Sequence, residues 1–599
     1  MKSLRDSRTT RGLALILSAS LIPLAIALSS LQFSAAADAY QPQQQPPFAD
    51  WSIIAAPLRL PRTAFTRLHD GSVIAVGRNS AERYDPVTRE WRDVPERMAF
   101  TRESPDAHLL PDGRLLVIGG LKDGAPNDRY AGPPEIYDPA TGKWTIVNTT
   151  GVDLKIKYSA LLGTTPITAL LPNGKVLIVD GSFLINSALL DLETGVIKLG
   201  AQYKQPLNAW FNTGSSSLTV LFDGKVLLKM PKDMLIYDPE SNAWTPVAVP
   251  NNNGTELLGR INATLPDGSL FSLLRTASSS MPESFFSGIF DPVSRQWGSY
   301  AARDSRGDTI VALTNGKVLT IEYESRSVTL YDPAEKSWRY INSPTNFTLG
   351  TAVLLADGTV LSGDQVYGAN FGLRAAPTAV STSAASFRVE PLAKESIASI
   401  FGVNLSGNVR IKDQSGVEHE VNRVLAATSN QINYLLPDNI SRGQAEIIIG
   451  SGQTQHRALI SIVNVAPGLF TANGDGRGAP GAVIVRVKAD GSQTFEPAAS
   501  FDSATGRFIP AAVELGPDTD SVFLVLFGTG VRNRTSLENT LVYIGGVKAP
   551  VQFIGAQGGF DGLDQINVQI PRGLVGRGDV DVLVTVDGKM ANPVRIKVN

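Results

Sequence analysis

Residues 110–120 of this chain read LPDGRLLVIGG, and this stretch decides the fold. Close copies, LPNGKVLIVDG and LPDGSLFSLL, begin at Leu171 and Leu265. Each copy places Asp-Gly or Asn-Gly between two apolar, β-forming runs, which is the sequence pattern of a β-hairpin. We expect a two-residue type I′ turn, in which both turn residues need a positive φ. The stretch therefore predicts a hairpin that recurs along the chain.

The hairpin pattern occurs seven times, at intervals of 42 to 61 residues. The turns are Asp70-Gly71, Asp112-Gly113, Asn173-Gly174, Asp223-Gly224, Asp267-Gly268, Asn315-Gly316 and Asp357-Gly358. Five of the units also carry an aromatic residue before Asp-Pro, with Trp six residues after the Asp. These aromatic pairs are Tyr84 and Trp91, Tyr137 and Trp144, Tyr237 and Trp244, Phe290 and Trp297, and Tyr331 and Trp338. Each unit thus supplies four strands, at a period typical of a β-propeller blade.

The ends of the repeat predict how the ring closes. The seventh turn has no Trp after it, whereas Trp51 precedes the first turn and belongs to no unit. Trp51 would therefore begin the outer strand of the last blade, so that the chain ends clasp each other. We expect seven blades over residues 51–374. The third unit has Leu190 and Ile197 in the aromatic positions, and six blades remain possible if this unit is irregular.

The hairpin and EIYDPATGKW at 135–144 together resemble the kelch repeat of galactose-oxidase-like propellers. The resemblance covers roughly 320 residues and implies the fold. It does not imply one function, because kelch propellers include enzymes, glycan binders and interaction scaffolds. A copper-radical site of the galactose oxidase kind needs a Cys cross-linked to a Tyr. The chain contains no Cys, which excludes that activity, and we expect no cofactor.

The C-terminal third contains two related β-rich segments. ASIFG at 398–402 precedes QINYLLP at 431–437, and FLVLFG at 523–528 precedes QINVQIP at 565–571. We expect a linker at 375–386, an Ig-like sandwich at 387–466, a β-rich connector at 467–520 and a second Ig-like sandwich at 521–599. The strands of the connector can pack with either sandwich. These motifs resemble IPT/TIG domains, and specifically the C-terminal module of acidobacterial exported proteins. The resemblance implies a surface module or a spacer. The whole chain is expected to be all-β.

The N-terminus has the pattern of a signal peptide over residues 1–37. Four basic residues precede an apolar run at 13–31, and small residues end at Ala37. The alternative to a cleaved signal peptide is an uncleaved membrane anchor. A Gln/Pro-rich linker follows at 38–50. Cleavage changes the net charge from −2 to −5, because residues 1–37 carry four basic groups and one acidic group. We expect a bacterial protein that is secreted or held at the cell surface, with no membrane insertion after cleavage and no nucleic-acid partner.

The sequence contains no catalytic motif and no metal-ligand spacing. The chain has four His; we expect His69 to be exposed and His108 to be satisfied by backbone within a strand. Recognition is expected in the loops that do not repeat, on the face of the ring away from the Asp-Gly turns. The candidate ligand-binding residues are Arg102, Asp106, Arg129, Tyr130, Tyr158, Trp210, Asn212, Arg275 and Asp304.

Three functions are compatible with this sequence. The first is an exported, non-enzymatic binding or adhesion protein whose loops recognise a glycan or a protein. The second is a carbohydrate-active enzyme with paired carboxylates in the central cavity, for which Asp106 and Asp304 are the candidates. The third is a purely architectural extracellular protein. The interleaved aromatic, Arg, Asn and Asp side chains of the loops favour the first.

Overall fold

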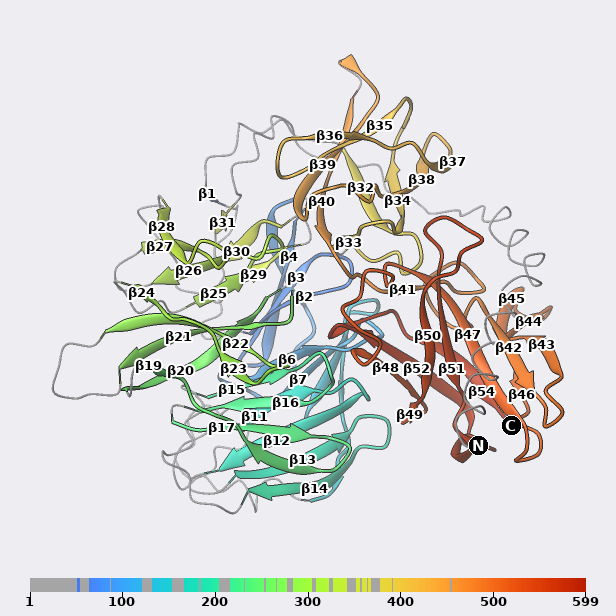
Figure 1. Ribbon diagram of the computed structural model, residues 1–599, viewed down its shortest axis with the longest axis horizontal. Coiled ribbons are helices and arrows are strands. Elements are labelled where there is room, and N and C mark those ends of the chain that lie inside the picture. The colour runs from blue at the N-terminus through green and yellow to red at the C-terminus, as the bar shows by residue number, and fades with distance from the viewer. Residues whose placement is uncertain are drawn as a thin grey trace, which may run out of the picture.

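The fold is described from a computed structural model of the chain (Figure 1). The described residues are 51–53, 64–86, 88–120, 132–152, 166–181, 185–203, 216–230, 232–252, 255–265, 267–276, 284–303, 309–322, 327–341, 352–355, 358–362, 365–367, 378–389, 391–452 and 455–599. The signal-peptide prediction lies outside them. Within these ranges the chain is all-β, with one short 3-10 helix, η5 (Arg572–Leu574). None of the described helices is long and apolar enough to span a membrane.

Seven sheets make up the first part of the chain, and their strands pair antiparallel except for β10, which pairs parallel with β14. Sheets one to three are β2–β5 (Ala64–Arg67, Val73–Gly77, Ser80–Asp85, Glu90–Asp93), β6–β9 (Asp106–Leu109, Leu115–Ile118, Glu135–Asp138, Lys143–Ile146) and β11–β14 (Ile167–Leu170, Lys175–Gly181, Ile185–Asp191, Val196–Tyr203), joined by β10 (Thr150–Gly151). Sheets four and five are β15–β18 (Ser217–Val220, Val226–Lys229, Met234–Asp238, Ala243–Pro246) and β19–β24 (Asn251–Asn252, Thr255–Thr264, Leu270–Thr276, Phe285–Asp291, Gln296–Trp297, Ala301–Arg303). Sheets six and seven are β25–β28 (Thr309–Ala312, Val318–Glu322, Ser327–Asp332, Ser337–Ile341) and β29–β31 (Ala352–Leu354, Val360–Ser362, Gln365–Tyr367) with β1 (Trp51–Ile53).

These sheets form a closed ring, the β-propeller that the repeat predicts. Their first strands contact one another in the order β2, β6, β11, β15, β20, β25, β29 and back to β2. A separate apolar cluster fills each junction between neighbouring sheets. In the second sheet, for example, Leu115 and Val117 pack against the first sheet, and Leu116 and Ile118 pack against the third. The second strands are therefore apolar on both faces because each face is covered by a neighbouring sheet.

The predicted closure by Trp51 is confirmed. Strand β1 pairs antiparallel with β31, which places Trp51 opposite Tyr367. The same register recurs inside the other sheets, where Tyr84 faces Trp91 with their ring centroids 5.4 Å apart. The six-residue spacing from Asp to Trp is what brings each aromatic pair into register across the turn. The N-terminal strand therefore completes the seventh sheet and leaves no open end in the ring.

The hairpin turns form, but the predicted type I′ geometry is wrong. Only the Gly of each described turn has a positive φ, such as 91° at Gly113. The Asp or Asn instead accepts a hydrogen bond from the backbone N–H two residues ahead, as Asp112 Oδ1 does from Arg114 N at 3.0 Å. Gly113 N donates to Leu110 O at 2.9 Å. This is a three-residue loop in which the Asp side chain caps the backbone and Gly alone occupies the left-handed region.

The C-terminal third folds into two β-sandwiches. The first pairs sheet β32-β34-β38-β37 (Ala379–Ser383, Ile397–Gly402, Gln431–Leu435, Val424–Ala427) with sheet β33-β40-β39-β35-β36 (Leu392–Ala393, His456–Val463, Gly443–Ile449, Val409–Lys412, Glu418–Glu420). The second pairs β41, β42, β43, β47, β50 and β51 (Gly468–Leu469, Ala482–Val487, Gln493–Pro497, Ser521–Thr529, Val551–Ala556, Asp564–Gln569) with β46, β48, β49 and β52–β54 (Ala512–Val513, Thr540–Ile544, Val547–Ala549, Gly578–Val586, Lys589–Met590, Val594–Val598). A separate hairpin is formed by β44 and β45 (Ala499–Asp502, Arg507–Pro510). One continuous core lies between the sheets of each sandwich.

Two expected boundaries in this region need correction. The linker at 375–386 contains β32, whose β-forming residues pair with β34. The connector at 467–520 supplies β42, which pairs with β47 along its whole length, and is therefore part of the second sandwich. The apolar run at 481–487 could not remain a connector because its side chains complete the core.

The related motifs of the two sandwiches occupy equivalent positions. Phe401 faces Gln431 in the first sandwich, and Phe527 faces Gln565 in the second. In both, the Gln amide donates to the Asn two residues later, at 2.8 Å to Asn433 and 2.7 Å to Asn567. The shared register and the shared side-chain bond show one module present twice.

Candidate functional site

The strand directions define two different ends of the ring. Every first strand ends at its Asp-Gly or Asn-Gly turn, so the beginnings of these strands lie at the opposite end. We call this opposite end the mouth. Asp106 is the first residue of β6, and Thr168 lies near the beginning of β11, on the neighbouring sheet. The mouth is therefore where a cluster of polar side chains crosses from the second sheet to the third.

Asp106, His108 and Thr168 form this cluster. Asp106 Oδ2 accepts hydrogen bonds from Thr168 N at 2.8 Å and from Thr168 Oγ1 at 2.7 Å. His108 Nε2 lies 2.7 Å from the same Thr168 Oγ1. Because the Thr168 proton is donated to Asp106, His108 Nε2–H is the donor to Thr168. Asp106 and His108 lie two residues apart on one strand, so their side chains leave it on the same face.

Burial is the main influence on both titratable groups. It raises the pKa of the Asp106 carboxyl, an effect that His108 and the Thr168 bonds oppose. Burial lowers the pKa of the His108 imidazole, and the nearby Asp106 opposes this effect. Opposite shifts in a carboxyl and an imidazole that share one hydrogen-bond partner are typical of functional sites.

The cluster retains unused hydrogen-bonding capacity. Within the described residues, Asp106 Oδ1 and His108 Nδ1 have no hydrogen-bond partner, and both side chains are only half-buried. With Nε2 protonated, Nδ1 is an acceptor, as is Oδ1. The cluster therefore offers two acceptor atoms to a ligand that carries hydroxyl or amino donors. His108 was expected to be satisfied by backbone, and its partner is instead the Thr168 side chain.

Arg102 has a structural place and is not available to a ligand. Its side chain is fully buried and pairs with Glu135 at 3.1 Å. The guanidinium also donates to Gly119 O at 3.0 Å and to Pro133 O. Glu135 accepts Ala99 N–H at 2.6 Å with its second oxygen. The predicted ligand contact is therefore corrected to a buried ion pair that ties the mouth-side segments of the second sheet together.

Of the remaining predicted site residues, Arg275 alone lies within the described part of the chain, and it is not brought to Asp106. Arg275 is half-buried at the mouth end of β21 on the fifth sheet, three sheets along the ring. The other six candidates lie outside the described residues, and their roles stay predictions: Arg129, Tyr130, Tyr158, Trp210, Asn212 and Asp304.

Lys229 is a second buried charge near the mouth. It is the last residue of β16 and has no exposed area. Its ammonium donates to Met230 O. Burial lowers the pKa of Lys229 to about 7, an effect that Asp233 opposes. The sequence offered no sign of this residue, because an isolated Lys at a strand end usually faces solvent.

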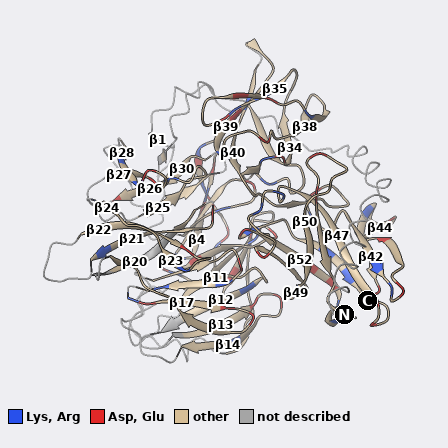
Figure 2. Cartoon of the chain, viewed as in Figure 1, with Lys and Arg blue, Asp and Glu red and all other residues tan. Residues whose placement is uncertain are grey.

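The rest of the described chain contains weaker candidates for a metal or ligand site. No group of three His, Cys, Asp or Glu residues that could hold a metal occurs within the described ranges. A cavity of about 300 Å³ lies in the second sandwich, beside Asp520, Lys548, Gln569 and Arg572. Its Arg572 side chain already donates to Gly516 O at 2.6 Å and to two other carbonyls. Figure 2 shows acidic and basic residues interspersed along the ribbon of the described strands.

Thr168 and Glu135 were missed by the sequence reasoning. The alternation in Asp106-Ala107-His108 was an available signal, because a strand with period two puts both polar residues on one side. Thr168 comes from another repeat 60 residues after His108, and only the closed ring brings the two together.

No family model and no curated protein matches this sequence. Among solved structures, virginiamycin B lyase from Staphylococcus aureus is similar over 53% of this chain and 98% of its own, at 11% identity and a TM-score of 0.35. The extracellular domain of a one-component system from B. thetaiotaomicron is similar over 67% and 56%, at 15% identity and a TM-score of 0.35. YCF48 from Cyanidioschyzon merolae is similar over 53% and 97%, at 16% identity and a TM-score of 0.35. These scores give no basis for transferring an activity, so the fold rests on the strand pairing of this chain.

Proposed function

We propose that this chain is an exported binding protein, with a kelch-type seven-bladed propeller that takes a glycan or protein ligand at its mouth. The observation that supports this proposal is the Asp106–Thr168–His108 cluster at the mouth, which has two acceptor atoms without a partner among the described residues. The hydroxyls of a sugar supply the donors that two such acceptors bind. The signal-peptide pattern supports export, and the tail resembles Ig-like modules.

The alternative, a carbohydrate-active enzyme, needs a second carboxylate beside Asp106. Its candidate, Asp304, lies outside the described residues. The described cluster by itself is suited to holding a ligand, because Asp106 and His108 share one threonine and are fixed in place.

A glycan array probed with the full chain tests this proposal. We expect wild-type protein to bind a group of related glycans and the double variant Asp106→Asn/His108→Gln to lose at least tenfold in affinity. Asp138→Asn is the matched control: it lies on the same sheet, is half-buried, and caps the outer turn at the other end of the ring. Retained binding by the double variant, or equal loss in the control, would contradict the placement of the site.

A further inference from the structure

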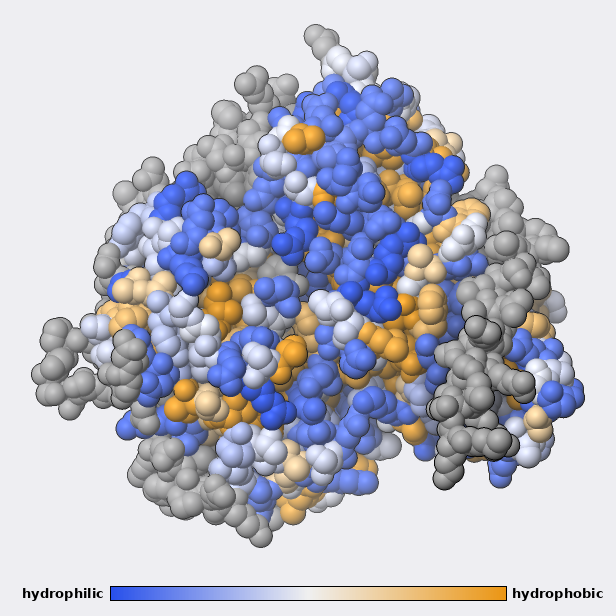
Figure 3. Space-filling model, viewed as in Figure 1, coloured by the Kyte–Doolittle hydropathy of each residue, from blue (hydrophilic) through white to orange (hydrophobic). Residues whose placement is uncertain are grey.

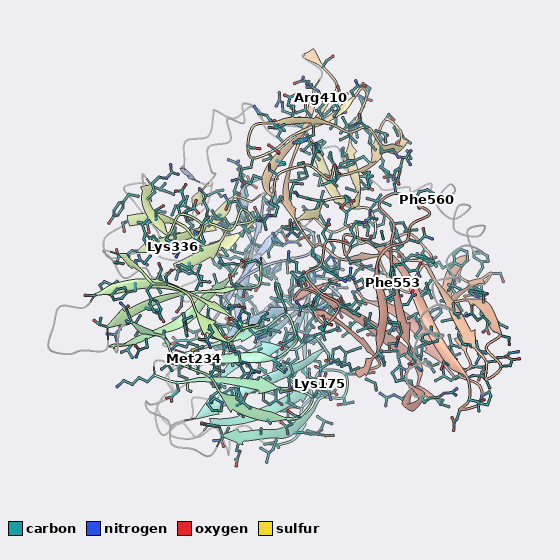
Figure 4. The ribbon with its side chains drawn as sticks, viewed as in Figure 1. Lys175, Met234, Lys336, Arg410, Phe553 and Phe560 are labelled. Carbon is teal, nitrogen blue, oxygen red and sulfur yellow. The ribbon has the colours of Figure 1, made fainter. Side chains whose placement is uncertain are left out.

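The two sandwiches lie against the turn end of the propeller. In Figure 1 the sandwiches occupy the upper right and right of the molecule, and Figure 3 shows their surface continuing into that of the ring. Figure 4 labels Lys175, next to the third turn (Asn173-Gly174), at the edge of the propeller beside the tail. We propose that residues 378–599 are a docked base of the propeller, built to cover its Asp-Gly turns, so that ligands reach the ring from the mouth.

The first sandwich contacts four of the seven turns. Val389 N donates to His69 O at 3.3 Å, and the Arg388 guanidinium donates to Pro111 O at 2.6 Å. Gly443 approaches the sixth turn so closely that a Cβ built on it would lie 3.4 Å from Asn315 Cβ. Gln444 packs on the seventh turn, where a Cβ built on Gly358 would lie 2.6 Å from Gln444 Cγ. The two hydrogen bonds are accepted by the carbonyls of His69 and Pro111, each of which directly precedes an Asp-Gly turn.

The second sandwich presents an apolar outer face to two further turns. On β48, Val542 and Ile544 point into the sandwich core, whereas Leu541 and Tyr543 point out of it. Leu541 is nevertheless only 3% exposed, because it packs on the fourth turn: a Cβ on Gly224 would lie 2.6 Å from Leu541 Cδ1. On the neighbouring β52, Leu583 packs on the third turn: a Cβ built on Gly174 would lie 3.4 Å from Leu583 Cδ1.

Polar groups complement this apolar contact. Lys548 forms an ion pair with Glu240 of the fourth sheet. Burial raises the pKa of Tyr543 to about 12, and the nearby Glu240 and Asp238 contribute. Phe222, beside the fourth turn, packs on Gly588, where a Cβ would lie 2.7 Å from its ring. Apolar residues on both faces of a strand indicate that both faces are covered, and here the second cover is the propeller.

The docking explains the state of His69. Burial and the Arg388, Arg477 and Arg67 charges lower the pKa of His69 to about 3. The unfolded chain takes up this proton near pH 6.5 and the folded chain near pH 3, so acidification between these values favours unfolding. The slope is up to about 1.4 kcal/mol per pH unit for one proton. We expect His69→Gln to reduce the acid sensitivity of urea unfolding between pH 7 and pH 4.5; an unchanged pH dependence would contradict a half-buried, neutral His69.

Carbodiimide cross-linking of the wild-type full chain tests the docking itself. A zero-length reagent joins the Lys548 amine to the Glu240 carboxyl with loss of water only where the two touch. We expect the Lys548–Glu240 peptide by mass spectrometry. The ion pair Lys317–Asp332, at 2.8 Å within the sixth sheet, is the internal positive control. Detection of the control link without the Lys548–Glu240 link would overturn the proposal.

An engineered disulfide gives a second, independent readout. The chain has no Cys, so the pair Phe222→Cys/Gly588→Cys forms without competition. A Cβ on Gly588 would lie 3.9 Å from Phe222 Cα, which is compatible with a disulfide. We expect oxidation to remove both free thiols from the folded double variant. Gly588→Cys alone controls for the strain of a Cys at φ 71°, and two persistent thiols in a folded double variant would contradict docking.

Discussion

Replacing Arg102 by Met is expected to lower the free energy of unfolding of the propeller by about 3–5 kcal/mol, because it leaves a buried carboxylate without its partner. Arg102 and Glu135 are 0% and 1% exposed. All seven Trp of the chain lie between residues 51 and 338, so Trp fluorescence in urea reports on the propeller alone. A loss of less than 1 kcal/mol would contradict the structural place given to Arg102.

Two further variants separate charge burial from loss of packing. Replacing Arg102 and Glu135 together with apolar residues is expected to recover most of the loss, because no buried charge is then left unpaired. Arg97→Met breaks the pair with Asp93, which is closer, at 2.8 Å, but about half exposed on both sides. This control is expected to cost at most about 1 kcal/mol.

Replacing Leu541 by Asp is expected to destabilise the propeller although the residue belongs to the tail. Leu541 packs on the fourth turn and is not part of the sandwich core. Truncation of a buried Leu costs about 2–5 kcal/mol, and an unpaired carboxylate at the same place adds to this. We expect the Trp fluorescence midpoint in urea to fall, because the sandwich no longer stabilises the turn end.

Leu537→Asp is the matched control for this change. Leu537 precedes β48 in the same sandwich and is 38% exposed, so the same chemical change buries no carboxylate there. We expect the control to retain the wild-type midpoint. If Leu541→Asp also retained it, the propeller would not depend on the tail.

The sequence predicted the features that the repeat pattern encodes. The spacing of Tyr137 and Trp144 set their pairing, and the orphan Trp51 indicated the ring closure. The turn type was wrong because Asp112 stabilises the loop through its side chain, which a rule about backbone φ values does not include. The boundaries at 375–386 and 467–520 were wrong because composition alone did not show that β32 and β42 pair with distant strands.

The side-chain contacts between distant residues that lie outside the repeat pattern could not be predicted. Thr168 reaches Asp106 only because the second and third sheets are neighbours in the ring. His69 was expected to be exposed, and the tail that covers it follows more than 300 residues later in the chain. One signal was present but unused: Leu541, Val542, Tyr543 and Ile544 are all apolar, and such a strand needs a cover on each face.

Whether a ligand enters at the mouth is tested most directly by the affinity of one array-identified glycan for single variants of the full chain. We predict that Asp106→Asn weakens binding at least tenfold, equivalent to about 1.4 kcal/mol. Phe501→Ser changes the most exposed aromatic side chain of the tail, at 60% exposure, and is predicted to leave the affinity unchanged. Unchanged binding in Asp106→Asn, with loss in Phe501→Ser, would place the site on the tail and contradict a ligand bound at the mouth.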